Sequence, residues 1–76
     1  MKVQILGTGC LKCRTLAANA EAAIQELGLN AQIEKIEDIR DIAAMGVALT
    51  PALAVDGVVK SSGRLLSVSQ ISKLLS

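Results

Sequence analysis

Histidine and aromatic residues are absent from this chain of 76 residues, and proline occurs once. Without histidine, a serine-histidine catalytic arrangement is excluded, and no pair of carboxylates is spaced for general acid-base work. Eight basic and seven acidic residues give a net charge of +1, with no basic cluster and no ring for bases to stack on. The features of nucleic-acid-binding proteins are therefore missing.

Long apolar runs are missing as well. The segment from Met1 to Leu6 is shorter than the apolar part of a signal peptide, and no run reaches the length of a membrane span. We therefore expect a cytoplasmic protein that has no membrane or nucleic-acid partner. At this length the chain forms one domain, residues 1–76, which buries about 60% of its unfolded surface, so an aliphatic core must stabilise it.

Cysteine is scarce but informative, because the only two cysteines, Cys10 and Cys13, are separated by two residues. They lie between a strand-like segment and a helical one. At such a junction the first sulfur can face the unpaired N–H groups of a helix N-terminus, which favour a thiolate. In a reducing compartment this spacing is typical of a catalytic or metal-binding pair rather than a structural disulfide. We interpret it as a candidate redox pair.

The apolar pattern predicts the secondary structure. Residues 3–6 form a short apolar run typical of a buried central strand, and apolar residues then recur at helical spacing from Cys13 to Leu27, ended by Gly28. Residues 31–36 read as an edge strand. Asp38 can cap a short helix that Gly46 ends.

The C-terminal part contains a hairpin and a helix. Residues 52–55 and 58–61 are strand-like and are joined by Asp56-Gly57, a strong hairpin signal. Ser67 and Gln70 have the spacing of a capping box before a last apolar helix. The predicted order is βαβαββα in a single α/β domain.

This order, together with Gly7-Thr8-Gly9-Cys10-Leu11-Lys12-Cys13 and Thr50-Pro51 before the third strand, resembles the thioredoxin-like superfamily in its minimal, glutaredoxin-sized form. More narrowly, the chain is similar to the small "redox-active disulfide" proteins of archaea and bacteria. The resemblance implies a four-stranded mixed sheet of order 2-1-3-4 with helices on both faces. It also implies a disulfide oxidoreductase.

The resemblance further assigns roles to single residues. Cys10 is expected to be the nucleophile, Cys13 the resolving thiol, and Pro51 a cis-proline beside them. Thr50 and Pro51, with Thr8 and Gly9, are the expected substrate-binding residues. Lys12 is expected either to stabilise the Cys10 thiolate or to be an ordinary exposed lysine.

The expected partners are a disulfide-containing protein or small molecule and an unidentified reductase. We expect a monomer that uses no cofactor or metal beyond its own cysteine pair. Because the chain lacks the aromatic residue of glutaredoxin motifs, binding of glutathione is not implied. The serines and glycine at positions 61–63 can be a simple turn.

Two other functions remain open at this point. Small copper chaperones also carry two cysteines at this spacing after a first strand, and thiolates suit Cu(I). Their element order is βαββαβ, however, and they usually have a methionine where this chain has Thr8. The second alternative is a thioredoxin-like adaptor that binds partners through Thr50 and Pro51 without turnover.

Overall fold

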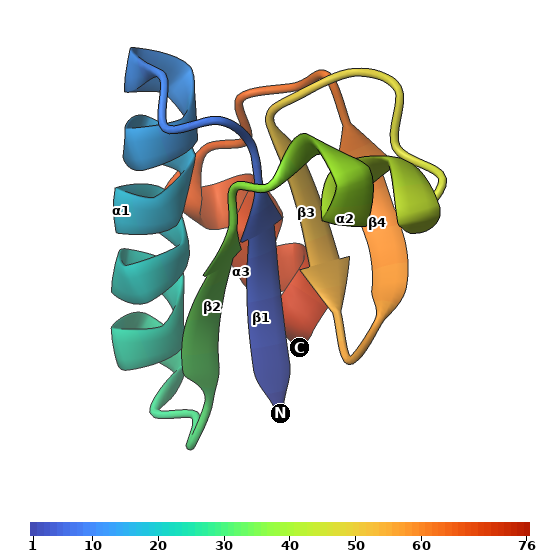
Figure 1. Ribbon diagram of the computed structural model, residues 1–76. Coiled ribbons are helices and arrows are strands. Elements are labelled where there is room, and N and C mark those ends of the chain that lie inside the picture. Colours follow the sequence, from blue (N-terminus) through green and yellow to red (C-terminus); the bar gives the residue numbers. More distant parts are fainter.

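The computed structural model describes all residues from Met1 to Ser76 and contains seven elements in the predicted order (Figure 1). The elements are β1 (Lys2–Leu6), α1 (Leu11–Leu27), β2 (Gln32–Ile36), α2 (Ile39–Ala44), β3 (Ala52–Val55), β4 (Val58–Ser62) and α3 (Val68–Leu75).

One mixed sheet of four strands organises the molecule, in the order β2-β1-β3-β4. The central strand β1 is parallel to β2 and antiparallel to β3, and β4 is antiparallel to β3. Ile5 of β1 lies between Lys35 of β2 and Leu53 of β3. The α/β fold class and the sheet order 2-1-3-4 are thus confirmed.

The three helices cover the two faces of the sheet unequally (Figure 1). On one face, α1 and α3 pack over the larger core cluster, which includes Val3, Ile5 and Leu53. On the other face, the short helix α2 covers a smaller cluster with Leu6 and Ile42. Because both faces are covered near the carboxyl end of β1, the loop that follows this strand has a rigid base.

Helix α1 has 17 residues, two more at its start than the apolar stripe from Cys13 indicates. Its buried residues repeat every three or four positions, as predicted: Cys13, Leu16, Ala17, Ala20, Ala23 and Ile24. Gly28 ends it in the left-handed conformation with φ of 66°, which glycine adopts without strain. No helix of the structure has the length and apolar character needed to cross a membrane.

Local capping signals account for the other helix starts. The Asp38 carboxylate accepts a hydrogen bond from the Arg40 backbone N–H at the start of α2. At the start of α3, Ser67 and Gln70 form both hydrogen bonds of a capping box.

Two strands differ by one residue from their predicted bounds. The predicted edge strand begins one residue later than expected, at Gln32, and β4 extends one residue further than expected, to Ser62.

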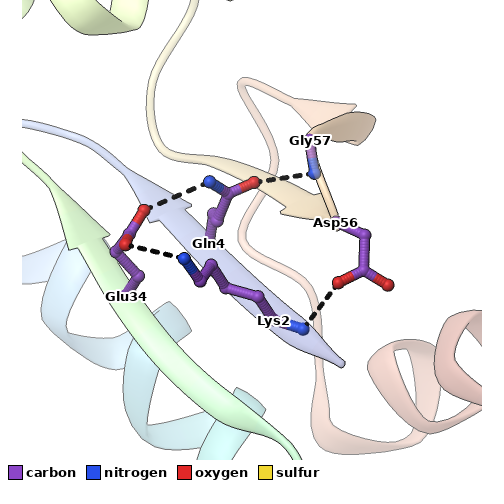
Figure 2. Close-up of polar contacts among 5 residues, drawn as sticks. All are labelled: Lys2, Gln4, Glu34, Asp56 and Gly57. Atoms are coloured by element: carbon purple, nitrogen blue, oxygen red, sulfur yellow. Dashed lines mark hydrogen bonds and ion pairs between the residues drawn. The ribbon is translucent and has the colours of Figure 1, made fainter.

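A polar network holds the strands together at the end of the sheet that is distant from the cysteines (Figure 2). The Gln4 amide donates to Glu34 and accepts from the Gly57 backbone N–H. The Lys2 ammonium forms an ion pair with Glu34 at 3.4 Å, and the Lys2 backbone N–H donates to Asp56. The Gln4 amide and the Lys2 ammonium hold the pKa of Glu34 below its usual value.

Candidate active site

At one end of the sheet, the loop that joins the carboxyl end of β1 to the start of α1 meets a segment distant in sequence, the one that leads into β3 (Figure 1). Cys10 is the N-cap residue of α1, and its side chain forms no capping hydrogen bond with the helix. Cys13 lies one turn further, on the buried face. The two cysteines therefore lie in different surroundings, Cys10 at the start of the helix and Cys13 on its core-facing side.

The two thiols are 2.8 Å apart, sulfur to sulfur. Cys10 is exposed, whereas Cys13 is only 5% exposed because it faces the core. No disulfide bond joins them in this structure. The Cys10 sulfur is therefore accessible to a substrate, and the buried Cys13 sulfur lies close enough to react with the Cys10 sulfur afterwards.

The surroundings lower the pKa of the Cys10 thiol and raise the pKa of the Cys13 thiol. The hydrogen bond from the Cys13 thiol lowers the pKa of Cys10, with further help from the backbone N–H groups of Cys13 and Lys12. Burial raises the pKa of Cys13, and its hydrogen bond to the Cys10 sulfur raises it further. Cys10 is therefore the thiol that ionises first, and Cys13 supplies the proton that stabilises it.

Gly7 makes the close packing of the site possible. It is buried at the end of β1, and its backbone N–H donates to the Ile36 carbonyl at 2.9 Å. A β-carbon at this position would overlap the Cys13 sulfur and would lie 3.2 Å from the Cys13 β-carbon and 3.9 Å from the Pro51 α-carbon. The sequence analysis identified Gly7 only as part of the motif and did not show that it lies close to both Cys13 and Pro51.

Pro51 and Thr50 border the site from the side of β3. The peptide bond between them is cis, Pro51 is buried, and its carbonyl accepts a hydrogen bond from Gly63 at 2.9 Å. Thr50 is exposed, and its backbone N–H and C=O form no hydrogen bond within the chain. An unpaired backbone segment thus lies next to the cysteine pair.

The other predicted site residues lie around Cys10. Thr8 is exposed in the loop before it, and Gly9 adopts a φ of 86°, which favours glycine. Lys12 is exposed on the first turn of α1. Its backbone N–H acts on the Cys10 sulfur, whereas a role for its ammonium stays a prediction.

A pocket of about 300 Å³ lies beside Cys13 on the side of β2. Besides Ile5, Gly7, Gly9 and Cys13, it is lined by the charged residues Arg14, Lys35 and Glu37. The sequence analysis missed this pocket. The signal that could have revealed it is the parallel pairing of β1 and β2, since the carboxyl ends of parallel strands meet at one edge.

Metal ligands are not gathered here. No group of three or more histidine, cysteine, aspartate or glutamate side chains in the structure is arranged to hold a metal ion. The observed element order also ends in a helix, unlike the order βαββαβ of copper chaperones.

Comparison with known proteins agrees with this geometry. A family model described as "Thioredoxin domain" matches residues 1–76. A thioredoxin of Methanothermobacter thermautotrophicus is 47% identical over 76 residues, which cover 100% of this chain and 99% of the relative. A thioredoxin of Methanocaldococcus jannaschii is 40% identical over 73 residues, 96% of this chain and 84% of the relative.

A solved structure described as "Structure of a malarial protein" shares the fold, with a TM-score of 0.70 over 97% of this chain and 91% of that chain at 12% identity. The two thioredoxin relatives and the close pair of thiols support a thiol-disulfide oxidoreductase in general terms. The family expected from the sequence is confirmed: the chain belongs to the thioredoxin domain family over its whole length.

Proposed function

We propose that this protein reduces disulfides of protein or peptide substrates through Cys10 and Cys13. One observation supports this most strongly: an exposed thiol with a lowered pKa lies 2.8 Å from a buried thiol with a raised pKa. A passive binding module has no need for thiols with such different properties. Thiol-disulfide exchange requires both, because one sulfur must attack and the other must wait.

The reaction has two steps. The Cys10 thiolate attacks one sulfur of the substrate disulfide, so a Cys10-substrate disulfide forms and the other substrate sulfur leaves as a thiolate that takes up a proton. Cys13 then loses its proton and attacks the Cys10 sulfur, which forms the Cys10–Cys13 disulfide and releases the second substrate thiol. Two electrons have passed from the protein to the substrate, and the second step is intramolecular.

Thr50 is the proposed binding residue for the substrate backbone. Its unpaired N–H and C=O, on an exposed segment, can pair with an extended chain as an added strand does. Leu11 beside Cys10 and Leu49 beside Thr50 are 74% and 64% exposed, so apolar surface is available on both sides. Pro51, Thr8 and Gly9 complete this proposed binding surface, and Lys12 is proposed to stabilise the thiolate.

A complete cycle needs a partner that restores the dithiol, and we propose a reductase whose identity the chain does not specify. We further propose that the protein works as a monomer in the cytoplasm and needs no cofactor besides its cysteine pair. A reducing compartment fits this proposal because free thiols persist there.

A single-turnover experiment tests the proposed function. The fully reduced protein, freed of reductant, is mixed with an excess of a peptide that contains one disulfide, then quenched with acid and analysed by mass spectrometry. One equivalent of peptide should be reduced as the Cys10–Cys13 disulfide appears. A Cys10→Ser variant should reduce none. If the unaltered protein stays reduced while correctly folded, the proposal is wrong.

A further inference from the structure

The charged side chains around the pocket beside Cys13 have no ion-pair partners. The structure contains two ion pairs, Lys2 with Glu34 and Arg40 with Asp38. Arg14, Lys35 and Glu37 take part in neither, although all three line the same pocket. Unpaired charges gathered beside a reactive pair can act on a bound molecule rather than on each other.

The pocket lies on the opposite side of the thiols from Thr50. Gly7 is at the centre: Pro51 borders it on the side of β3, and the Ile36 carbonyl accepts its N–H on the side of β2. Lys35 and Glu37 flank Ile36 in sequence, and Arg14 follows Cys13 in α1. A substrate chain that pairs with Thr50 on one side thus leaves the pocket free on the other.

The net charge and size of the pocket indicate what can enter it. Two cationic side chains and one carboxylate line the pocket, and the Glu37 carboxylate lies 2.9 Å from where a Gly9 β-carbon would be. A volume of about 300 Å³ is at the lower end of small-molecule sites, which range over about 300–1,000 Å³. It suits one side chain. A residue two positions from the substrate cysteine lies about 7 Å along an extended chain and points to the same side as that cysteine.

We propose that Arg14 and Lys35 select substrates that carry an acidic side chain close to the disulfide, with that carboxylate held in this pocket. Glu37 opposes this selection and limits it. The inference rests on the proposed function, because the acidic side chain belongs to the disulfide substrate. It assigns a substrate class to the site: disulfides with aspartate or glutamate two positions from a cysteine.

Three synthetic peptides test the inference. Each contains the same single disulfide, and the residues two positions from its cysteines are glutamate, glutamine or lysine. The rate constant for oxidation of the reduced protein is measured in single turnover, and each value is divided by that of dithiothreitol with the same peptide to cancel the peptide's own reactivity. The glutamate peptide should react about two- to fivefold faster than the glutamine peptide, as expected for one exposed ion pair.

Substitutions in the pocket should change this glutamate-to-glutamine ratio in opposite directions. Lys35→Gln and Arg14→Gln should each lower it towards one, whereas Glu37→Gln should raise it. Lys60→Gln, on the opposite edge strand β4, removes the same charge and should leave the ratio unchanged, as should Glu26→Gln near the end of α1. Raising the salt concentration should lower the ratio for the unaltered protein.

The possible outcomes separate the two proposals. Equal normalised rates for all three peptides would overturn the acidic preference and leave disulfide reduction intact. The preference is also overturned if Lys35→Gln and Arg14→Gln change the ratio no more than Lys60→Gln does, or if Glu37→Gln lowers it. Failure to oxidise the protein with any peptide would refute the proposed function and this inference together.

Discussion

Replacing Gly7 with alanine should damage both the stability and the chemistry of this protein. The added β-carbon would overlap the Cys13 sulfur and approach the Cys13 β-carbon to 3.2 Å. Gly7 is buried against α1 on one side and Pro51 on the other, so no neighbour can move away freely. Either the strand end or the first turn of α1 must shift, which separates the two sulfurs from their spacing of 2.8 Å.

The size of the effect follows from overpacking. Inserting a methyl group into a closely packed site costs about 1–3 kcal/mol. A domain of 76 residues has a free energy of unfolding of about 4–11 kcal/mol, and its dependence on urea is about 1 kcal/mol per molar. The midpoint of urea unfolding should therefore fall by about 1–3 M.

The assay is urea unfolding followed by far-ultraviolet circular dichroism, since the chain has no aromatic residue to report by fluorescence. A double-mutant cycle with Cys13→Ala isolates the overlap, because this change removes the sulfur that the new methyl group meets. In the Cys13→Ala background, Gly7→Ala should cost at least about 1 kcal/mol less than in the unaltered protein. Equal costs in both backgrounds would refute the reasoning.

The remaining predictions concern the fold and the reactivity of Cys10. Ser67→Ala removes the hydroxyl that caps α3 and should lower the free energy of unfolding by about 1 kcal/mol, or Tm by about 4–8 °C. Ser69→Ala alters no capping hydrogen bond and should leave Tm unchanged. Equal Tm values for the two variants would contradict the capping role. Leu53→Ala leaves a cavity at a fully buried position and should lower the free energy of unfolding, measured in urea, by about 2–5 kcal/mol. Leu49→Ala, at a largely exposed position, should lower it by less than about 0.5 kcal/mol. Similar losses for the two variants would contradict the core assignment. Alkylation of Cys10 by iodoacetamide should reach half its plateau rate at a lower pH than alkylation of an ordinary cysteine thiol, because the Cys13 hydrogen bond lowers the pKa of Cys10. The rate falls as pH drops through that lowered pKa, and Cys13→Ala should shift the half-plateau to higher pH; an unshifted profile would contradict the role of the hydrogen bond.

Local sequence signals predicted the fold well because each of them is strong in this chain. Gly28 after a regular apolar stripe, the Asp56-Gly57 hairpin signal and the Ser67 and Gln70 capping box each specify one local conformation, and all are present. Small errors occurred only at element ends, such as Gln32 and Ser62, where propensity changes gradually along the chain.

Contacts between residues that are distant in sequence were less predictable. The pair of cysteines was visible from its spacing, and Thr50-Pro51 from the resemblance. Lys35 and Glu37 are exposed charges, and nothing in the sequence alone places them near the cysteines. Their place beside Cys13 depends on the register of β2 against β1 and on the path of the chain after β2, which no local pattern of residues specifies. The contact between Gly7 and Cys13 likewise exists only after β1 and α1 have packed.

The most direct test of the central claim is covalent trapping of substrate by a Cys13→Ser variant. If Cys10 attacks and Cys13 resolves, this variant should stop after the first step and stay joined to a disulfide-containing protein through Cys10. On a non-reducing gel the Cys13→Ser variant should form a conjugate that dithiothreitol releases, and the Cys10→Ser variant should form none. If the two folded, reduced variants trap equal amounts of substrate, the proposed division of roles between Cys10 and Cys13 is wrong.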